Sequence, residues 1–397
     1  MKFITGLLLI ISCLGWASFS PHAKEIMPSQ VGAEQTQLYF PKLKNKRIGL
    51  VVNQTSRAKQ QHLVDLLVSN NFEVKKIFAP EHGFRGDHDA GAHINSGKDS
   101  KTGIDIVSIY GKHKKPSAQH LADLDVIVFD IQDVGVRFYT YISSMFYVMQ
   151  AAAQHNVEMI VLDRPNPNIA FVDGPMLNPK FRSFVGLLPV PIMHGMTVGE
   201  LAQMTLHEGW LDTIENPKKV KHNLKLEVIS VNNYARQDSY TLPVLPSPNL
   251  PNQQAIALYP SLCLFEATPV SVGRGTDFPF QVLGHNQHFV GDFTFSPRSI
   301  PGVSTYPKLE GKKLTGVDLR RSKLQGFDLS HFYQWFTVFN TQQTDFFSNA
   351  QFLDKLAGTD QIRLDMLNGK SLDQIKQAWQ QDLQAFKQQR QRYLLYP

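Results

Sequence analysis

The chain has 397 residues, of which 42% are hydrophobic and 19% are charged, and its formal net charge is +6 at pH 7. This length exceeds what one ordinary domain needs and the composition is that of a globular protein, so two domains are expected. The positive charge suits an acidic partner, but no basic stripe with interleaved aromatic residues occurs, which argues against nucleic acid.

The first residues carry the pattern of a secretory signal peptide. Lys2 is followed by an almost unbroken apolar run over residues 3–14 and then by small residues at positions 17, 18 and 20. The run is too short to span a bilayer comfortably, and no later segment is long and apolar enough to do so. We therefore expect residues 1–23 to be a signal peptide and the mature protein to be periplasmic, without a membrane span.

The two cysteines bear on export and on stability. Cys13 loosely resembles a lipoprotein cleavage site, but it lies unusually close to the amino terminus, so lipidation is the less favoured alternative. After processing only Cys263 remains, which excludes an intramolecular disulfide, so the core alone must stabilise the fold. For an exported, positively charged protein, we expect an anionic cell-wall polymer as the partner.

Residues 47–78 read as a strand, a helix and a second strand. Residues 47–52 form a short apolar run that ends in a polar loop containing Asn53. Residues 62–69 carry leucine and valine at helical spacing, and residues 72–78 form the next apolar run. This order predicts a parallel β-α-β unit.

The second strand leads into residues 80–86, PEHGFRG, which place an acid, an imidazole and a guanidinium beside two glycines. In an open parallel sheet, ligands bind at the carboxyl ends of the strands, where this loop should lie. Glu81 could be kept protonated by partial burial and act as a general acid, with His82 orienting or tuning it. The alternative is a solvated carboxylate that only stabilises its loop.

The pattern of strand and polar loop recurs along the next hundred residues. Apolar runs at 104–110, 126–129 and 158–162 each end in a loop marked by polar residues, glycine or proline, and residues 139–155 read as a helix. Several such loops should converge at one edge of a mostly parallel α/β sheet and form a ligand site there.

Three carboxylates are candidates for a second catalytic group. Asp130 and Asp133 follow the strand at 126–129, and Glu266 lies much later in the chain. The two aspartates could instead cap a helix or pair with Arg137, and spacing does not choose among the three.

Other polar residues in these loops are candidates for substrate binding. The planar fork of arginine suits a ligand that bears a carboxylate, although each arginine could equally form an ordinary salt bridge, and a histidine before glycine is often only a satisfied loop residue. These candidates are Asn53, Arg85, Arg137, Tyr139, Arg164, Asn166, His194 and Arg274.

Metal and cofactor sites find little support. His82, His88 and His93 form an imidazole-rich run, which leaves a metal-dependent hydrolase as an alternative, but no HExxH or other close ligand spacing occurs. No GxGxxG follows the first strand, and residues 273–276 lack the Walker spacing and its lysine. We therefore predict neither a metal nor a cofactor.

The second half of the chain begins with a change of pattern. Thr197 and Glu200 form a capping box that starts a helix, and residues 243–251 hold four prolines. We place the domain boundary at the prolines, with a catalytic domain over residues 40–245 and a smaller α/β domain over residues 246–397. Near the end, one helix is predicted from apolar residues at helical spacing, namely Ile375, Trp379, Leu383 and Phe386.

Taken together, the motifs resemble the exo-acting β-N-acetylmuramidases, from about residue 47 to beyond residue 280. The motifs are PEHGFRG (80–86), SIYG (108–111), FDIQDVGVRFYTYI (129–142), LDRPNPN (162–168), HGMTVGELA (194–202), LPSPNLP (245–251) and FEATPVSVGRGT (265–276). The resemblance implies a glycoside hydrolase that removes terminal N-acetylmuramic acid from the non-reducing end of peptidoglycan fragments. It also implies a Rossmann-like, doubly wound amino-terminal domain, a cleft between two domains, and Glu81 as the catalytic acid.

The chemistry fits this resemblance. Cleaving a glycosidic bond needs an acid and a second carboxylate, and the lactyl carboxylate of muramic acid would explain several arginines. The expected partners are peptidoglycan-derived muropeptides or disaccharides.

Three departures from the family pattern stand out. Val272 replaces a carboxylate, which leaves open a non-catalytic wall-binding protein. Residues 166–169 replace a small glycine pair, and residues 283–286, which include His285, replace an alanine-proline-tryptophan segment. The last two changes suggest an altered substrate preference.

Overall fold

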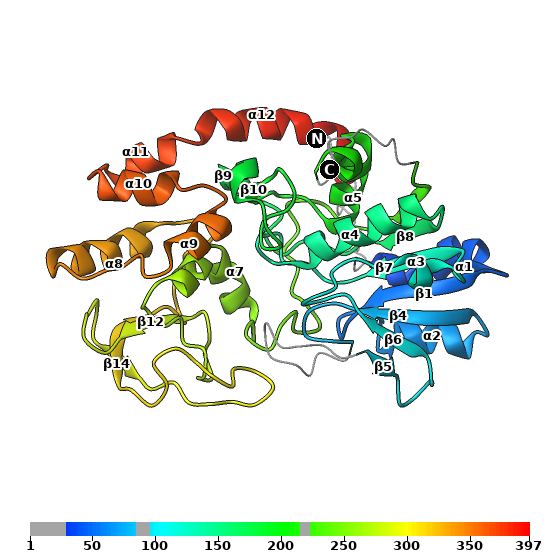
Figure 1. Cartoon of the computed structure of the whole chain (residues 1–397), viewed down its shortest axis with the longest axis horizontal. Coiled ribbons are helices and arrows are strands. Elements are labelled where there is room, and N and C mark those ends of the chain that lie inside the picture. The colour runs from blue at the N-terminus through cyan, green and yellow to red at the C-terminus, as the bar shows by residue number, and fades with distance from the viewer. Residues whose placement is uncertain (1–28, 85–95, 215–222) are drawn as a thin grey trace, which may run out of the picture.

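The computed structural model describes residues 29–84, 96–214 and 223–397, so the predicted signal peptide lies outside the described residues. Two lobes lie side by side in Figure 1. The larger lobe surrounds a seven-stranded sheet, and the smaller lobe combines helices with a three-stranded sheet. None of the helices in the described ranges has the length and apolar character that a membrane crossing requires.

The large sheet is mostly parallel, as predicted. Its strand order is β11-β8-β7-β1-β4-β6-β5, and β5 alone pairs antiparallel with its neighbour. The strands are β1 (Arg47–Val52), β4 (Glu73–Ala79), β5 (Gly97–Lys98), β6 (Asp105–Ser108), β7 (Val126–Asp130), β8 (Glu158–Leu162) and β11 (Leu226–Ile229). After β6 the chain returns to the other side of β1, so the sheet has a switch point between β1 and β7.

Both faces of the sheet are buried, which is why its central strands are continuous apolar runs. Ile48 and Leu50 of β1 pack in one core with α1 (Thr36–Leu43) and α2 (Leu63–Ser69). Val51 packs in the other, with α4 (Tyr141–Gln154) and α5 (Val198–His207). The larger lobe is therefore doubly wound.

The smaller lobe follows the proline-rich segment. It contains α7 (Gln253–Leu262), the 3₁₀-helix η3 (Cys263–Ala267) and an antiparallel sheet of order β12-β14-β13. Those strands are β12 (Val282–His285), β13 (Phe293–Phe295) and β14 (Leu314–Asp318). The remaining helices are α8 (Ser330–Thr341), α9 (Ala350–Ala357), α10 (Gln361–Leu367), α11 (Leu372–Gln377) and α12 (Gln380–Arg390).

The end of the chain differs from the prediction in one respect. The single predicted terminal helix is two helices, α11 and α12, which meet at Ala378 and Trp379. Helix α12 runs back toward the larger lobe, and the carboxyl terminus lies near α5 in Figure 1. There Leu395 N donates to Glu200 Oε1 at 2.7 Å, so the last residues pack on the larger lobe.

Candidate active site

A cavity of about 610 Å³ lies between the two lobes. From the larger lobe it is lined by Glu81, His82, Tyr110, Phe138, Tyr139, Thr140, Phe184 and Val185. Residues of the proline-rich segment and the smaller lobe that line it include Ser247, Asn249, Glu266, Arg274, Phe280 and Tyr306. Loops at the carboxyl ends of β4 and β6 supply part of this wall, so the cavity lies at the sheet edge where a site was expected.

Glu81 lies on the loop that leaves β4, and two hydroxyl groups hold its carboxylate. Tyr110 donates to Oε1 at 2.9 Å, and Thr140 Oγ1 donates to Oε2 at 2.8 Å. Burial and the charge of Glu81 raise the pKa of Tyr110 well above its ordinary value, so the phenol stays protonated and able to donate. The half-buried Glu81 carboxyl therefore has a fixed orientation.

His82 connects this loop to the proline-rich segment. It is buried, and its Nε2 lies 3.1 Å from Oγ of Ser247. Its φ of 67° is in the left-handed region, as is the φ of 77° at Gly83. For a residue with a Cβ this backbone conformation costs about 1 to 3 kcal/mol, and such strain is typical of functional sites. The turn at His82 thus sets the direction of the neighbouring Glu81.

Glu266 faces the cavity from the other lobe, paired with Arg274. Nε of Arg274 lies 3.0 Å and 3.2 Å from the two carboxylate oxygens. Behind them, Lys308 Nζ donates to the carbonyls of Phe265 and Val270 at 3.1 Å and 3.2 Å, and also to that of Thr268. Burial lowers the pKa of Lys308 to about 8, although the charge of Glu266 opposes this change. The lysine therefore fixes the turn that carries Glu266.

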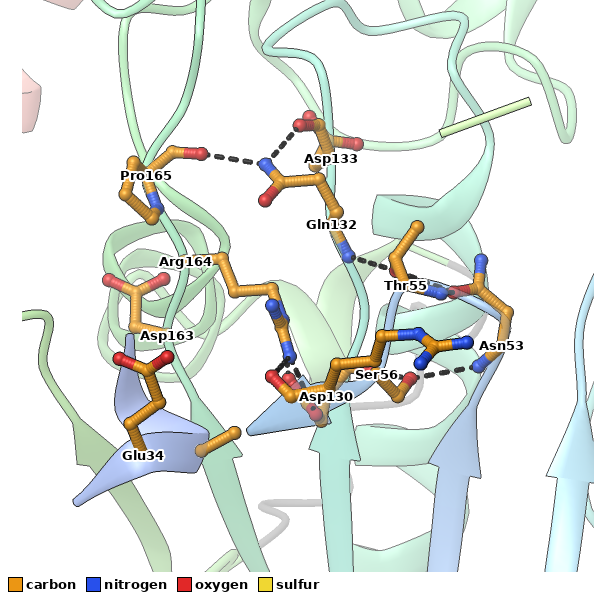
Figure 2. Close-up of polar contacts among 12 residues, drawn as sticks. Glu34, Asn53, Thr55, Ser56, Asp130, Gln132, Asp133, Asp163, Arg164 and Pro165 are labelled. Carbon is orange, nitrogen blue, oxygen red and sulfur yellow. Dashed lines mark hydrogen bonds and ion pairs between the residues drawn. The ribbon is translucent and has the colours of Figure 1, made fainter. Parts of the chain in front are cut away.

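Asp130 is the last residue of β7 and does not line the cavity. It is fully buried and accepts from Nε and Nη2 of Arg164 at 2.6 Å and 2.9 Å (Figure 2). Burial alone would raise the pKa of Asp130, and the guanidinium opposes this by stabilising the carboxylate. Ser56 Oγ donates to the carbonyl of Asp130. The switch point between β1 and β7 is thus filled by the protein's own polar groups.

Asp133 is also buried, but without a cationic partner in the described contacts. Its Oδ2 accepts from Gly135 N at 2.6 Å, and Gln132 Nε2 donates to its carbonyl at 2.8 Å. Burial raises the pKa of Asp133 to about 7. This carboxyl group packs within the loop that follows β7 (Figure 2).

Arg137 joins the lobes through main-chain carbonyls. Its Nη1 donates to Pro175 O and Val190 O at 2.9 Å and 2.8 Å, and its Nη2 donates to Leu356 O and Ala357 O at 3.3 Å and 2.6 Å. Burial lowers its pKa to about 9. The guanidinium is fully buried, so its position is structural.

Three further candidates are buried among main-chain groups. Asn53 Oδ1 accepts from Thr55 N at 2.9 Å, and Asn166 Nδ2 donates to Met196 O at 2.9 Å. Burial, assisted by nearby arginine charges, lowers the pKa of His194 to about 3, so this imidazole is neutral. These side chains shape the loops behind the cavity.

The structure therefore divides the predicted site residues into three groups. Those that line the cavity are Glu81, His82, Tyr139, Glu266 and Arg274. Those buried elsewhere are Asn53, Asp130, Asp133, Arg137, Arg164, Asn166 and His194. Those outside the described residues are Arg85, His88 and His93. Within the described ranges, no three histidine, cysteine or acidic side chains are placed to hold a metal ion.

Sequence reasoning did not assign Tyr110, Thr140 and Ser247, which contact Glu81 and His82. Tyr110 had a usable signal, because it ends the predicted apolar run at 104–110, directly before a loop. For Thr140 and Ser247, the sequence held no signal of a role in the site beyond their place in the motifs.

None of the three departures from the family pattern contributes to the cavity lining. Val272 is 3% exposed and its carbonyl accepts from Phe280 N at 2.7 Å. His285 is buried, and burial lowers its pKa to about 4. The absence of a carboxylate at position 272 therefore leaves both carboxylates that line the cavity, Glu81 and Glu266, in place.

Two family models and a known relative match this chain along almost its whole length. The family model described as exo-beta-N-acetylmuramidase NamZ, N-terminal, matches residues 48–254, and its C-terminal counterpart matches residues 257–396. The peptidoglycan beta-N-acetylmuramidase NamZ of Bacillus subtilis (strain 168) is 37% identical over 423 residues, which cover 99% of this chain and 98% of that protein.

Solved structures show the same fold. Two DUF1343 family proteins of Bacteroides fragilis NCTC 9343, with crystal structures at 1.30 Å and 1.65 Å, align with TM-scores of 0.83 and 0.79. They are 45% and 27% identical to this chain, and each alignment covers 93% of this chain and 99% of the other.

Proposed function

The chain belongs to the NamZ family of exo-β-N-acetylmuramidases and is a glycosidase, and on that premise we propose that Glu81 is its general acid. The reaction is release of terminal β-linked N-acetylmuramic acid from the non-reducing end of peptidoglycan fragments. One observation carries the assignment of the site. Among the described residues, Glu81 and Glu266 are the carboxylates that line the cavity, and they enter it from different lobes.

The surroundings of the two carboxylates support different roles. Glycoside hydrolysis needs one carboxyl group to protonate the leaving oxygen and a second to act as base or nucleophile. Glu81 accepts from the hydroxyls of Tyr110 and Thr140, which stabilise the carboxylate that forms once the proton has passed to the leaving oxygen. Glu266 is paired with a guanidinium, which stabilises a charged carboxylate. We assign the acid to Glu81 and the second role to Glu266.

Arg274 is the candidate for recognising the lactyl carboxylate. It is the motif arginine that lines the cavity within the described part of the chain. Its bonds to Glu266 use Nε, which leaves the two terminal nitrogens to bind a ligand. A muramic acid carboxylate could therefore bind to the same guanidinium that orients Glu266.

The assignment is tested by release of a reporter from a chromogenic β-N-acetylmuraminide, compared with the matching β-N-acetylglucosaminide. Glu81→Gln should lower kcat on the muraminide by about 10²-fold to 10⁴-fold, because general acid catalysis is lost. Glu310→Gln, at an exposed residue outside the cavity lining, is the matched control.

Thermal unfolding checks that each variant is folded. Full activity of folded Glu81→Gln would contradict the assignment. A folded wild type that binds muropeptides but cleaves neither reporter would instead favour the non-catalytic alternative.

We further propose that the protein acts in the periplasm. The signal-peptide pattern of residues 1–23 and the positive net charge support this location. Fractionation of cells that express the full chain, or the chain without residues 1–23, tests it. Retention of the full chain in the cytoplasm would overturn the proposal. If Cys13→Ser leaves the amount of protein in the membrane-free fraction unchanged, a lipid on Cys13 does not anchor the protein.

A further inference from the structure

Tyr306 lies at the mouth of the cavity. This residue is 91% exposed, which is more than any other large hydrophobic residue in the described ranges. The same residue lines the cavity that contains Glu81 and Glu266. A residue that both lines this cavity and is almost fully exposed lies at the opening, where its ring is available to a ligand.

The backbone that carries this ring is fixed on both sides. Before it, Ile300 and Ser304 exchange main-chain hydrogen bonds at 2.9 Å and 2.8 Å, and Asn249 Nδ2 donates to Val303 O at 2.7 Å. After it, Lys308 is anchored under the turn that carries Glu266. Tyr306 is therefore an exposed ring on an anchored loop, which loses little conformational entropy when it binds a ligand.

A second aromatic ring lies on the opposite wall. Phe184 lines the cavity from the larger lobe and stacks on Tyr147 with ring centroids 6.3 Å apart. Lys114 Nζ lies 4.8 Å from the centroid of the Phe184 ring. The cavity thus has an aromatic residue on each side, and a cation beside the one in the larger lobe.

We propose that Tyr306 forms the subsite for the leaving-group sugar, N-acetylglucosamine, by stacking on the C–H face of its ring. This inference rests on the proposed function. An exo-acting enzyme encloses the terminal sugar near its acid, so the rest of the fragment must leave through the mouth of the cavity. The sugar next to the cleaved bond therefore passes Tyr306, whose electron-rich ring face attracts the slightly positive C–H groups.

The test compares substrates whose leaving groups differ. One is the disaccharide in which N-acetylmuramic acid is linked to N-acetylglucosamine, and the other is methyl β-N-acetylmuraminide, whose leaving group has no ring. Release of N-acetylmuramic acid is measured by chromatography. Tyr306→Ala should lower kcat/KM on the disaccharide by about tenfold, mainly through KM, and leave the methyl glycoside unchanged.

Two variants make the comparison specific. Tyr306→Phe keeps the ring and should behave as wild type. Phe289→Ala removes another exposed ring, 54% exposed and outside the cavity lining, and should change neither substrate. Equal losses on both substrates in Tyr306→Ala, or no loss on either, would overturn the inference.

A binding measurement separates this inference from the proposed function. Calorimetry measures the affinity of the disaccharide for Glu81→Gln with and without Tyr306→Ala, so no turnover is needed. A loss of about tenfold supports the subsite whether or not the wild type cleaves the disaccharide. Equal affinities overturn the subsite even if the wild type is active.

Discussion

At the scale of single residues, the three carboxylates considered for the second catalytic role have three different surroundings. Glu266 lines the cavity, Asp130 is buried against Arg164, and Asp133 is buried among main-chain groups. Only a group that reaches the substrate can change the rate of bond cleavage directly. Substitution of the three should therefore change three different measurements.

Glu266→Gln should change the rate. Loss of the base or nucleophile should lower kcat on the chromogenic muraminide by about 10²-fold or more, with little change in the unfolding temperature. Asp277→Asn is the control, because it breaks an exposed ion pair with Arg298 in the same lobe. If folded Glu266→Gln retained wild-type kcat, the second carboxylate would have to be sought elsewhere.

Asp133→Asn should change how stability depends on pH. Burial raises the pKa of Asp133 to about 7, so between about pH 4 and pH 7 the folded chain holds a proton that the unfolded chain has lost. Stability from this group is therefore fully present at low pH and is lost as the pH rises toward 7. Asparagine keeps an acceptor for Gly135 N but cannot ionise.

Urea unfolding of both proteins at pH 4.5 and pH 8 measures this effect. The unfolding free energy of Asp133→Asn minus that of wild type should be higher at pH 8 than at pH 4.5, by on the order of 2 kcal/mol. Other titrating groups, such as Asp163, are common to both proteins and cancel in the difference. The same difference between the proteins at both pH values would mean that Asp133 is ionised in the folded state.

At the scale of elements, the Asp130 and Arg164 pair ties the end of β7 to the loop after β8. Arg164→Met leaves the buried Asp130 carboxylate without its partner and should cost about 3 to 5 kcal/mol of unfolding free energy. The double variant with Asp130→Leu removes both charges and should be more stable than Arg164→Met alone. Urea unfolding at pH 7 measures both, and a double variant less stable than the single one would contradict this account.

The elements were the most predictable part of the molecule. β1 and β8 occupy the predicted ranges 47–52 and 158–162, because a strand buried on both faces is a continuous apolar run. The capping box at Thr197 begins α5 as predicted. The break between α11 and α12 was missed because the apolar residues on either side, such as Ile375 and Leu383, keep helical spacing across it.

The surroundings of individual polar residues were less predictable. Arg137 looked like a ligand-binding arginine, but it donates to carbonyls of residues that lie 38 to 220 positions away in the chain. Nothing near Arg137 in the sequence shows that these carbonyls will surround it. Glu81 and Arg274, in contrast, lie on loops at the cavity, where motif and exposure agree.

At the scale of the whole molecule, the carboxyl terminus closes the fold by returning to the larger lobe. Tyr396 is buried, its hydroxyl donates to Asp163 Oδ2, and it accepts from Val231 N at 2.9 Å. Arg236 N donates to Pro397 O at 2.9 Å. Because α12 belongs to the smaller lobe, these contacts link the lobes at a further place, besides the proline-rich segment and the bonds from Arg137 to Leu356 and Ala357.

Deletion of residues 394–397 should therefore destabilise the larger lobe. The deletion exposes the apolar surface that Tyr396 covers and removes hydrogen bonds to two buried carboxylates, Asp163 and Glu200. Together these losses should lower the unfolding free energy by about 3 to 5 kcal/mol. Tyr396→Phe keeps the ring and removes only the hydroxyl, so it should cost about half as much. Urea unfolding followed by tryptophan fluorescence measures both, and a deletion that leaves the midpoint unchanged would show that the lobes are held together without their carboxyl-terminal contact.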